Sequence, residues 1–345
     1  MPGWMHRALP GWLNHSAAGP DEPFRRESGP LPTDSPVMPT RMPPRMPPAR
    51  IPPRSGTGVR HLVVGAASPR RDKRGNWNDR GMTRNDGYLL DNRQTEAGER
   101  FDAFATLFDP TTFRHIEGFG IGAGWRCWEV GAGGTSVVSW LAKKVGPTGK
   151  IVATDIDTSQ LASDARPPVE VRVHDVSADE PPGEGFDLVH ARLVLVHVPD
   201  RERALRSMIE ALRPGGRLLI EDADPALQPL ICPDEYGPEQ QLANRLRQGF
   251  RKLLADRGAD LSYGRRLPRL LREAGLRQVT ADAYFPITSP ACAALESATV
   301  RQIRDQLVTG GIATDADIDR HLANVASGRM DLATAPLISA WGRKP

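Results

Sequence analysis

The sequence predicts an α/β domain in which helices wind around a parallel sheet. Apolar, strand-like runs alternate with segments of helical periodicity from Met82 to the C-terminus, and this alternation is typical of such sheets. A glycine-rich turn, Gly131 to Gly134, directly follows the first run, where doubly wound sheets bind cofactors. We therefore expect one domain over residues 82–345, with a sizeable core.

The elements are predicted from apolar spacing and from glycine and proline stop signals. Strands are expected over residues 126–130, 150–154, 170–173, 186–191, 217–221, 275–285 and 334–341. Helices are expected over residues 96–108, 110–119, 137–145, 201–212, 238–257, 266–274, 300–308 and 315–326. The helices at 238–257 and 266–274, inserted after the fifth strand, are candidates for a lid, and the last two helices for part of a pocket wall.

The first 81 residues differ in composition from the rest of the chain. They hold 15 of the 32 prolines and 13 Lys and Arg against 6 Asp and Glu, a net charge of +7. Their repeat RMPPRMPPARIPPR cannot bury enough apolar surface to fold, which predicts a disordered tail. A polyproline ligand or a basic tether is the functional alternative. Translation starting at Met82, which would place the tail outside the natural protein, is a hypothesis that N-terminal sequencing tests.

Composition also bounds the partners of the remaining 264 residues, which carry a net charge of −4 because the whole chain is +3. An acidic body argues against a nucleic-acid partner. The cysteines Cys127, Cys232 and Cys292 are far apart and lack metal-site spacing, which predicts reduced thiols and no metal site. The lack of a long apolar run predicts no membrane span. We expect a soluble cytoplasmic protein, whose oligomeric state, a homodimer included, the sequence leaves open.

Acidic residues surround the glycine turn. Glu129 lies two residues before Gly131, and Asp155 ends the second strand in ATDID, where a carboxylate can accept hydrogen bonds from both hydroxyls of a ribose. Asp175 follows the third strand in the same way, where it can accept from the amino group of an adenine while Val176 contacts the ring. Together these residues predict an adenosine site.

The ordered segments EVGAGG, TDID, HDV, FDLVHARLVLVHVPD and LRPGGRLLIED resemble those of the class I S-adenosylmethionine-dependent methyltransferases. The likeness is to the branch of the ubiquinone and menaquinone biosynthesis methyltransferases, and it is strongest over residues 126–222. It implies a Rossmann-like sheet of seven strands, with the last strand antiparallel beside the fifth. It also implies S-adenosylmethionine as cofactor and methyl transfer to an oxygen, nitrogen or carbon of a small acceptor.

The resemblance assigns roles to individual residues. Glu129 would hold the methionine ammonium of the cofactor, with an ion pair to Arg126 or a lysine as the alternative for its carboxylate. Tyr88 and Arg93 are candidates to close over the cofactor. The remaining cofactor contacts are implied for Gly131 and Gly133 (backbone approach), Asp155 (ribose), Ile156, Asp175 and Val176 (adenine), and Ala191 and Arg192 (sulfonium and methionine part).

Methyl transfer from a sulfonium needs a general base only for some acceptors, such as a hydroxyl. His197, after the fourth strand at the rim of the predicted pocket, is the candidate base, whereas His190 is expected to be a hydrogen-bonded strand residue. The basic residues of helix 238–257 are expected to face solvent, with attraction of an anionic acceptor as the alternative. They are Arg245, Arg247, Arg251 and Lys252.

Two other functions stay open. A NAD-dependent oxidoreductase is disfavoured, because Ser136 replaces the third glycine of the dinucleotide fingerprint and because a dinucleotide has no ammonium for Glu129. A catalytically silent S-adenosylmethionine-binding regulatory protein would look the same in sequence, because methyl transfer can proceed without a protein acid or base. Turnover against a metabolite panel would separate this silent protein from an active methyltransferase.

Overall fold

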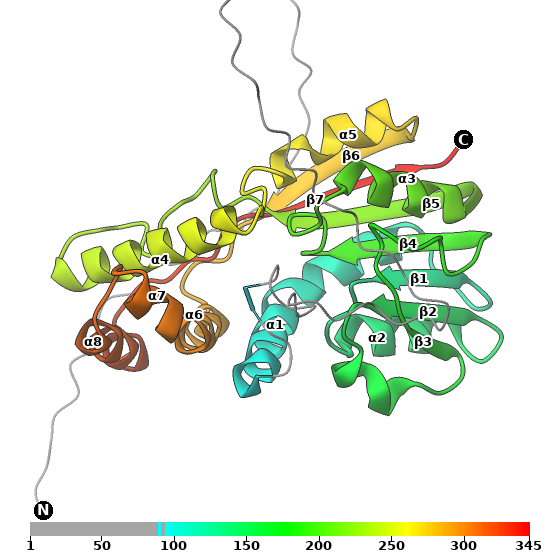
Figure 1. The fold of residues 1–345 in the computed structure, drawn as a ribbon. Helices are drawn as coiled ribbons and strands as arrows, with labels where there is room; N and C mark the ends of the chain where they lie inside the picture. The colour runs from blue at the N-terminus through cyan, green and yellow to red at the C-terminus, as the bar shows by residue number, and fades with distance from the viewer. Residues whose placement is uncertain (1–88, 91–93) are drawn as a thin grey trace, which may run out of the picture. The chain divides into compact units, whose positions relative to one another are not determined.

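Seven strands form one sheet in the order β3-β2-β1-β4-β5-β7-β6, in a computed structural model that describes residues 89–90 and 94–345 (Figure 1). The strands are β1 (Arg126–Val130), β2 (Lys150–Asp155), β3 (Val169–Val173), β4 (Phe186–Arg192), β5 (Leu212–Ala223), β6 (Arg277–Tyr284) and β7 (Leu337–Arg343). β1 to β5 pair in parallel, and β7 lies antiparallel between β5 and β6. The predicted Rossmann-like doubly wound sheet is confirmed. The predicted tail, Tyr88 and Arg93 lie outside the described residues.

Helices connect the strands and extend beyond the sheet. They are α1 (Thr95–Gly118), α2 (Ser136–Val145), α3 (Arg201–Ala211), α4 (Pro238–Asp256), α5 (Leu267–Glu273), α6 (Pro290–Gln302), α7 (Arg304–Thr309) and α8 (Asp315–Ala326), with 3-10 turns η1 (Ser159–Asp164) and η2 (Gly264–Arg266). No helix of the part of the chain that the structure describes is long and apolar enough to cross a membrane.

Both faces of the sheet are buried, which explains the continuous apolar character of its strands. Cys127 and Ile151 pack against α1 and α2. The alternate residues Trp128 and Val152 share a cluster with α3 and α5 on the opposite face. This alternation follows from the two-residue period of a strand. It places Glu129, which follows Trp128, on the face that α1 covers.

α1 differs from the prediction. Two short helices are predicted at 96–108 and 110–119, but α1 runs unbroken through Pro110. A proline in a helix interior costs about 3 kcal/mol. Both halves of α1 are held by tertiary packing, since Phe108 lies in a cluster with α6 and Ile116 packs against the sheet. Packing therefore outweighs the local preference to break.

β5 and α6 also depart from the prediction. β5 starts at Leu212, which pairs with Phe186 before the register shifts, so the Arg-Pro-Gly-Gly stretch is an irregularity inside the strand. α6 starts at Pro290 instead of residue 300, capped by Ser289, whose side chain accepts a hydrogen bond from the Ala291 amide. Most sides of α6 are buried, so it lacks the polar face that reveals a helix in sequence.

Of the two predicted lid helices, α4 lines the cavity and α5 does not. α5 packs on the sheet, because Leu267 and Leu271 belong to the core cluster with α3. α4 instead shares an apolar cluster with α6 and α7, formed by residues such as Leu246, Val300 and Leu307. Figure 1 shows α4, α6, α7 and α8 gathered to one side of the sheet. Of these helices, α4 and α6 line the candidate site together with α1, whereas α7 and α8, predicted to be part of the pocket wall, do not.

Candidate functional site

A cavity of about 470 Å³ lies where β1 to β5 end, a size typical of ligand pockets. Its walls at the sheet end are the turns after these strands, and its walls at the other end come from α1, α4 and α6. All of the predicted cofactor residues except Ala191 line this cavity. The predicted cofactor residues thus converge on one cavity, and the predicted lid helix α4 lines its other end together with α1 and α6.

The glycine turn brings bare backbone to the cavity. Gly131 and Gly133 have φ values of +60° and +56°, in the left-handed region that side chains disfavour. A Cβ on Gly131 would collide with the Val194 side chain, and one on Gly133 would lie 2.7 Å from Cε1 of Phe101. Glycine is thus required at both positions by conformation and by space.

Asp155 links the ends of β1 and β2. Its carboxylate accepts hydrogen bonds from the amide of Gly133 at 2.9 Å and from the amide of Asp157 at 3.0 Å. Burial raises the pKa of Asp155, although these amides oppose the rise. The carboxylate is therefore fixed in orientation, with further lone pairs for a ligand.

The turns after β2 and β3 provide an apolar surface beside an acid. Ile156 is a large apolar side chain left 58% exposed in the cavity wall, and the buried side chain of Val176 lines the same cavity. Asp175 uses Oδ1 to accept from both the amide and the hydroxyl of Ser177, at 2.9 and 2.7 Å. A flat ring could pack against Ile156 and Val176 while a donor at its edge bonds the Asp175 carboxylate.

Glu129 is 3% exposed and is paired with His190, not with Arg126 or a lysine. The Oε2 atom of Glu129 lies 2.7 Å from Nδ1 of His190, while no described residue bonds Oε1. Nε2 of His190 lies 3.3 Å from Oε2 of Glu221. Burial opposes the charged imidazolium, but Glu129 and Glu221 raise the pKa of His190 to about 9. His190 is thus the structural strand residue that was predicted, and it is positively charged at neutral pH.

The same ionic chain continues across the sheet. Glu221 accepts from Thr112, from Ser339 at 2.7 Å and from Nδ1 of His115 at 3.2 Å. Nε2 of His115 in turn lies 3.0 Å from Oδ2 of Asp282, on the edge strand β6. Carboxylates and imidazoles therefore alternate from the cavity to the outer edge of the sheet. We call Glu129, His190, Glu221, His115 and Asp282 the ionic chain.

Ala191 and Arg192 lie differently from each other. Ala191 is buried in the core cluster on the α3 face and does not line the cavity. Arg192 lines it, with its guanidinium held on α1 by Asp109 at 2.8 Å and Thr112 at 3.0 Å. The positive charge of Arg192 is therefore balanced by a protein carboxylate.

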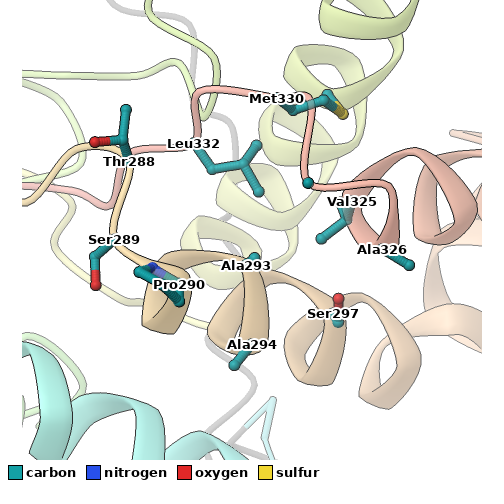
Figure 2. A pocket seen from close by; sticks show the side chains of 11 residues that line it. Thr288, Ser289, Pro290, Ala293, Ala294, Ser297, Val325, Ala326, Met330 and Leu332 are labelled. Carbon is teal, nitrogen blue, oxygen red and sulfur yellow. The ribbon is translucent and has the colours of Figure 1, made fainter. Parts of the chain in front are cut away.

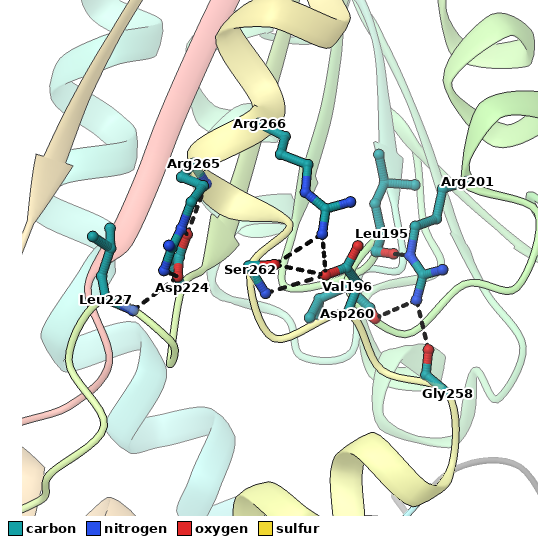
Figure 3. Close-up of polar contacts among 10 residues, drawn as sticks. All are labelled: Leu195, Val196, Arg201, Asp224, Leu227, Gly258, Asp260, Ser262, Arg265 and Arg266. Atoms are coloured by element: carbon teal, nitrogen blue, oxygen red, sulfur yellow. Dashed lines mark hydrogen bonds and ion pairs between the residues drawn. The ribbon is translucent and has the colours of Figure 1, made fainter. Parts of the chain in front are cut away.

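The segment after β4 brings His197 to the cavity wall. The Arg201 side chain holds this segment in place (Figure 3). The Arg201 side chain donates to the carbonyls of Leu195 and Val196, at 2.9 and 3.0 Å, and to that of Gly258 at 2.7 Å. Burial, with the positive charges of Arg100 and Arg201, lowers the pKa of His197 to about 4. The ring is neutral at physiological pH.

The loop beyond this segment has its own ion pairs (Figure 3). Asp224, at the end of β5, accepts from the Arg265 guanidinium at 2.6 and 2.7 Å, and Asp260 accepts from Arg266 at 2.8 Å. The amide of Asp260 donates to the carbonyl of Val196 at 3.0 Å. The wall that carries His197 is thus tied to the chain after α4.

Arg100 is a cavity residue that the sequence argument missed. It lies on α1 four and eight residues before Phe104 and Phe108, so it occupies the apolar stripe of the helix. An arginine at that spacing is the signal that could have found it.

A second hollow lies between the start of α6 and the end of α8 (Figure 2). Small apolar side chains and a few hydroxyls line it, and no ionisable side chain of the described residues does. Within the same part of the chain, no cluster of three His, Cys, Asp or Glu residues could hold a metal ion. The chemistry-bearing groups are gathered in the large cavity.

Known proteins resemble the chain around this cavity. A family model described as a methyltransferase domain matches residues 128–218. Methyltransferase str2 of Strobilurus tenacellus is 39% identical over 100 residues, 28% of this chain and 34% of that protein. A ubiquinone/menaquinone biosynthesis C-methyltransferase of Pseudomonas fluorescens is 36% identical over 113 residues, covering 30% of this chain and 44% of the relative.

The chain spans about a third to a half of the length of these curated relatives. A solved structure of phosphoethanolamine N-methyltransferase 2 from Haemonchus contortus is 17% identical, with a TM-score of 0.47, over 74% of this chain and 59% of that one. The motifs, the strand order and the matched domain agree with one another. Residues 128–218 of this chain therefore form a methyltransferase domain.

Proposed function

We propose that the chain transfers the methyl group of S-adenosylmethionine to an oxygen, nitrogen or carbon atom of a small organic acceptor. The observation that carries this proposal is the arrangement of three carboxylates around one cavity. Glu129, Asp155 and Asp175 lie at or just after the ends of β1, β2 and β3, and the bare backbone of Gly131 lines the same cavity. No single carboxylate would support a cofactor assignment, but the set matches the parts of one cofactor.

The residues present fit this cofactor. Oε1 of Glu129, which no described residue bonds, would accept from the methionine ammonium, because Oε2 is already held by His190. Asp155, fixed by two amides, would accept from the ribose hydroxyls. Asp175 and the exposed Ile156 would take the edge and one face of the adenine.

When bound, S-adenosylmethionine supplies a methyl group already activated for in-line displacement, so the protein has to align the acceptor and exclude water. Arg192 and His197 line the cavity wall that the end of β4 and the segment after it form. The lid helices α4 and α6 close the opposite side. We therefore assign alignment of the acceptor to the segment after β4, whose carbonyls Arg201 holds.

His197 is the proposed base for a hydroxyl acceptor. With its pKa lowered to about 4, its ring is unprotonated above about pH 5, although its basicity is weak. His197→Ala should lower turnover more than affinity for S-adenosylhomocysteine, and wild-type turnover should show no protonation step of this residue between pH 6 and 8. Equal losses of turnover and affinity would indicate a packing role instead.

The cofactor assignment is tested by calorimetric titration of the full chain with S-adenosylhomocysteine, with NAD in parallel. Saturable binding of S-adenosylhomocysteine alone is expected. Binding of NAD alone would contradict the methyltransferase proposal. Turnover of S-adenosylmethionine against a panel of small metabolites then tests catalysis, and binding without any turnover would favour a silent regulatory protein.

A further inference from the structure

The helical end of the cavity carries charge of one sign. In the part of the chain that the structure describes, the acids that line the cavity are Glu129, Asp155 and Asp175, and all three lie at the sheet end. The lining of the helical end contains Arg100, Arg247, Arg251 and Arg257. The cavity is therefore acidic where the cofactor is proposed to bind and basic at the other end.

Among the described residues, Arg100 is a buried cation without a carboxylate partner. It is only 2% exposed, and its Nη1 donates to the neutral amide oxygen of Gln302 at 3.0 Å. Its guanidinium lies 5.7 Å from the ring centre of Phe104, and its Nε has no hydrogen-bond partner. None of the described acids pairs with it. A buried guanidinium in this state is stabilised by an added anion.

Arg247 and Arg251 lie one turn apart on α4, on the side that faces the cavity. Arg247 forms an ion pair with Glu296, which also bonds His321, and its own Nε has no hydrogen-bond partner. Arg251 has a buried, unbonded Nε and forms no ion pair or hydrogen bond with a described residue. Two cations at this spacing repel each other, so the pair favours a negatively charged ligand.

The other basic residues of α4 behave as the sequence predicted. Arg245 pairs with Asp317 and Lys252 pairs with Asp256, and both cations are more than half exposed. The prediction of a solvated face is wrong for Arg247 and Arg251. Helix α4 thus has a solvated basic face and a separate basic face that lines the cavity.

We propose that the methyl acceptor is an amphipathic oxyanion, with a carboxylate or phosphate held by Arg100, Arg247 and Arg251. Guanidinium groups match both oxyanions in planar, two-point hydrogen bonds. The apolar body of the acceptor packs against Phe104, Phe250 and Leu254, which line the same end. This proposal rests on the proposed function, because it names the acceptor of the same site.

The test uses the full chain saturated with S-adenosylhomocysteine, and calorimetry of three probes. Phenylacetate, phenyl phosphate and the neutral phenylacetamide share an apolar ring and differ in charge. At least one anion should bind roughly tenfold more tightly than the amide. The carboxylate and phosphate arms identify which oxyanion the site prefers.

Two variants of α4 locate the effect. Arg251→Gln should abolish the preference for the anion and leave S-adenosylhomocysteine binding unchanged. Arg245→Gln, which removes the same charge from the solvated face, should retain the preference. Equal affinity for amide and anions, no anion binding to the saturated complex, or equal losses in both variants would overturn the proposal. Failure to bind S-adenosylhomocysteine would instead overturn the proposed function.

Discussion

Asp155 offers the sharpest single-residue test of the cofactor site. Asp155→Asn removes the charge that would accept from the ribose hydroxyls, and charge-assisted hydrogen bonds contribute about 1.5–3 kcal/mol each. We expect S-adenosylhomocysteine affinity to fall at least about tenfold, as measured by calorimetry. Asp157→Asn removes a neighbouring charge whose carboxylate bonds the amide of Ser159, and it should bind as wild type. Matching losses in both variants would point to long-range charge and not to a ribose contact.

Gly131 tests the conformation of the turn. Gly131→Ala places a methyl group against Val194 at a positive φ, so we expect lower S-adenosylhomocysteine affinity and a destabilisation of about 1–3 kcal/mol. Gly98→Ala in α1 adds the same methyl group where it meets no atom within 4 Å. That variant should be unchanged or more stable by about 0.5–1 kcal/mol. Urea unfolding measures both, and an equally stable Gly131→Ala protein would contradict the strained turn.

At the scale of elements, the Arg201 side chain and the Asp260 amide hold the segment after β4. Arg201→Gln removes the donors that hold the carbonyls of Leu195, Val196 and Gly258. We expect turnover to fall several-fold, because the wall with His197 loses its anchor, with a smaller change in S-adenosylhomocysteine affinity. Arg203→Gln is the matched control, since Arg203 lies on α3 but bonds Ala178. A turnover loss shared by both variants would assign the effect to α3 stability.

The sheet elements could be predicted from sequence because their signals are local. β1 ends at Val130 and α8 spans Asp315–Ala326, as predicted, since both are bounded by turn or capping residues. α6 could not be found, because its surface is buried by α1 and α8 and leaves no polar face. The continuation of α1 through Pro110 could not be predicted either, because it depends on tertiary packing at both ends of the helix.

The same distinction holds for the site. The acids and glycines of the site directly follow or end apolar runs that predict strands, so short stretches of sequence are enough to find them. Arg100 and Arg251 belong to helices that meet only in the folded chain, so their convergence on one cavity depends on tertiary structure. Pairing of Glu129 with His190 likewise depends on the register between β1 and β4, which places the two residues opposite each other.

At the scale of the whole molecule, two buried groups predict that stability falls toward alkaline pH. Burial raises the pKa of Asp222 to about 8, so the folded chain retains a proton that the unfolded chain releases near pH 4. Despite its burial, the pKa of His190 is raised to about 9 by Glu129 and Glu221, against about 6.5 when unfolded. In both cases the native state binds more protons, so the free energy of unfolding decreases as pH rises between 6 and 9.

Urea unfolding of the wild type at pH 6, 7, 8 and 9 measures this slope. The side chain introduced by Asp222→Asn carries no proton that ionises. The free energy of unfolding of this variant should therefore increase relative to that of the wild type as pH rises to about 8. His190→Gln should be destabilised most at pH 6, where His190 is charged between Glu129 and Glu221, with a smaller deficit at pH 9. A constant difference between variant and wild type across pH would contradict the assigned protonation states.

The ionic chain couples the effects of substitutions at five positions on separate elements. Replacing one member leaves a neighbour with a buried, uncompensated charge, and such losses are strongly destabilising. Replacing His190 and Glu221 together by apolar residues would remove opposite charges at once, so their effects should not add. Descendants of this chain would therefore change these positions jointly or keep them all. Co-variation spanning β1, β4, β5, β6 and α1 is the trace that this constraint would leave among related sequences.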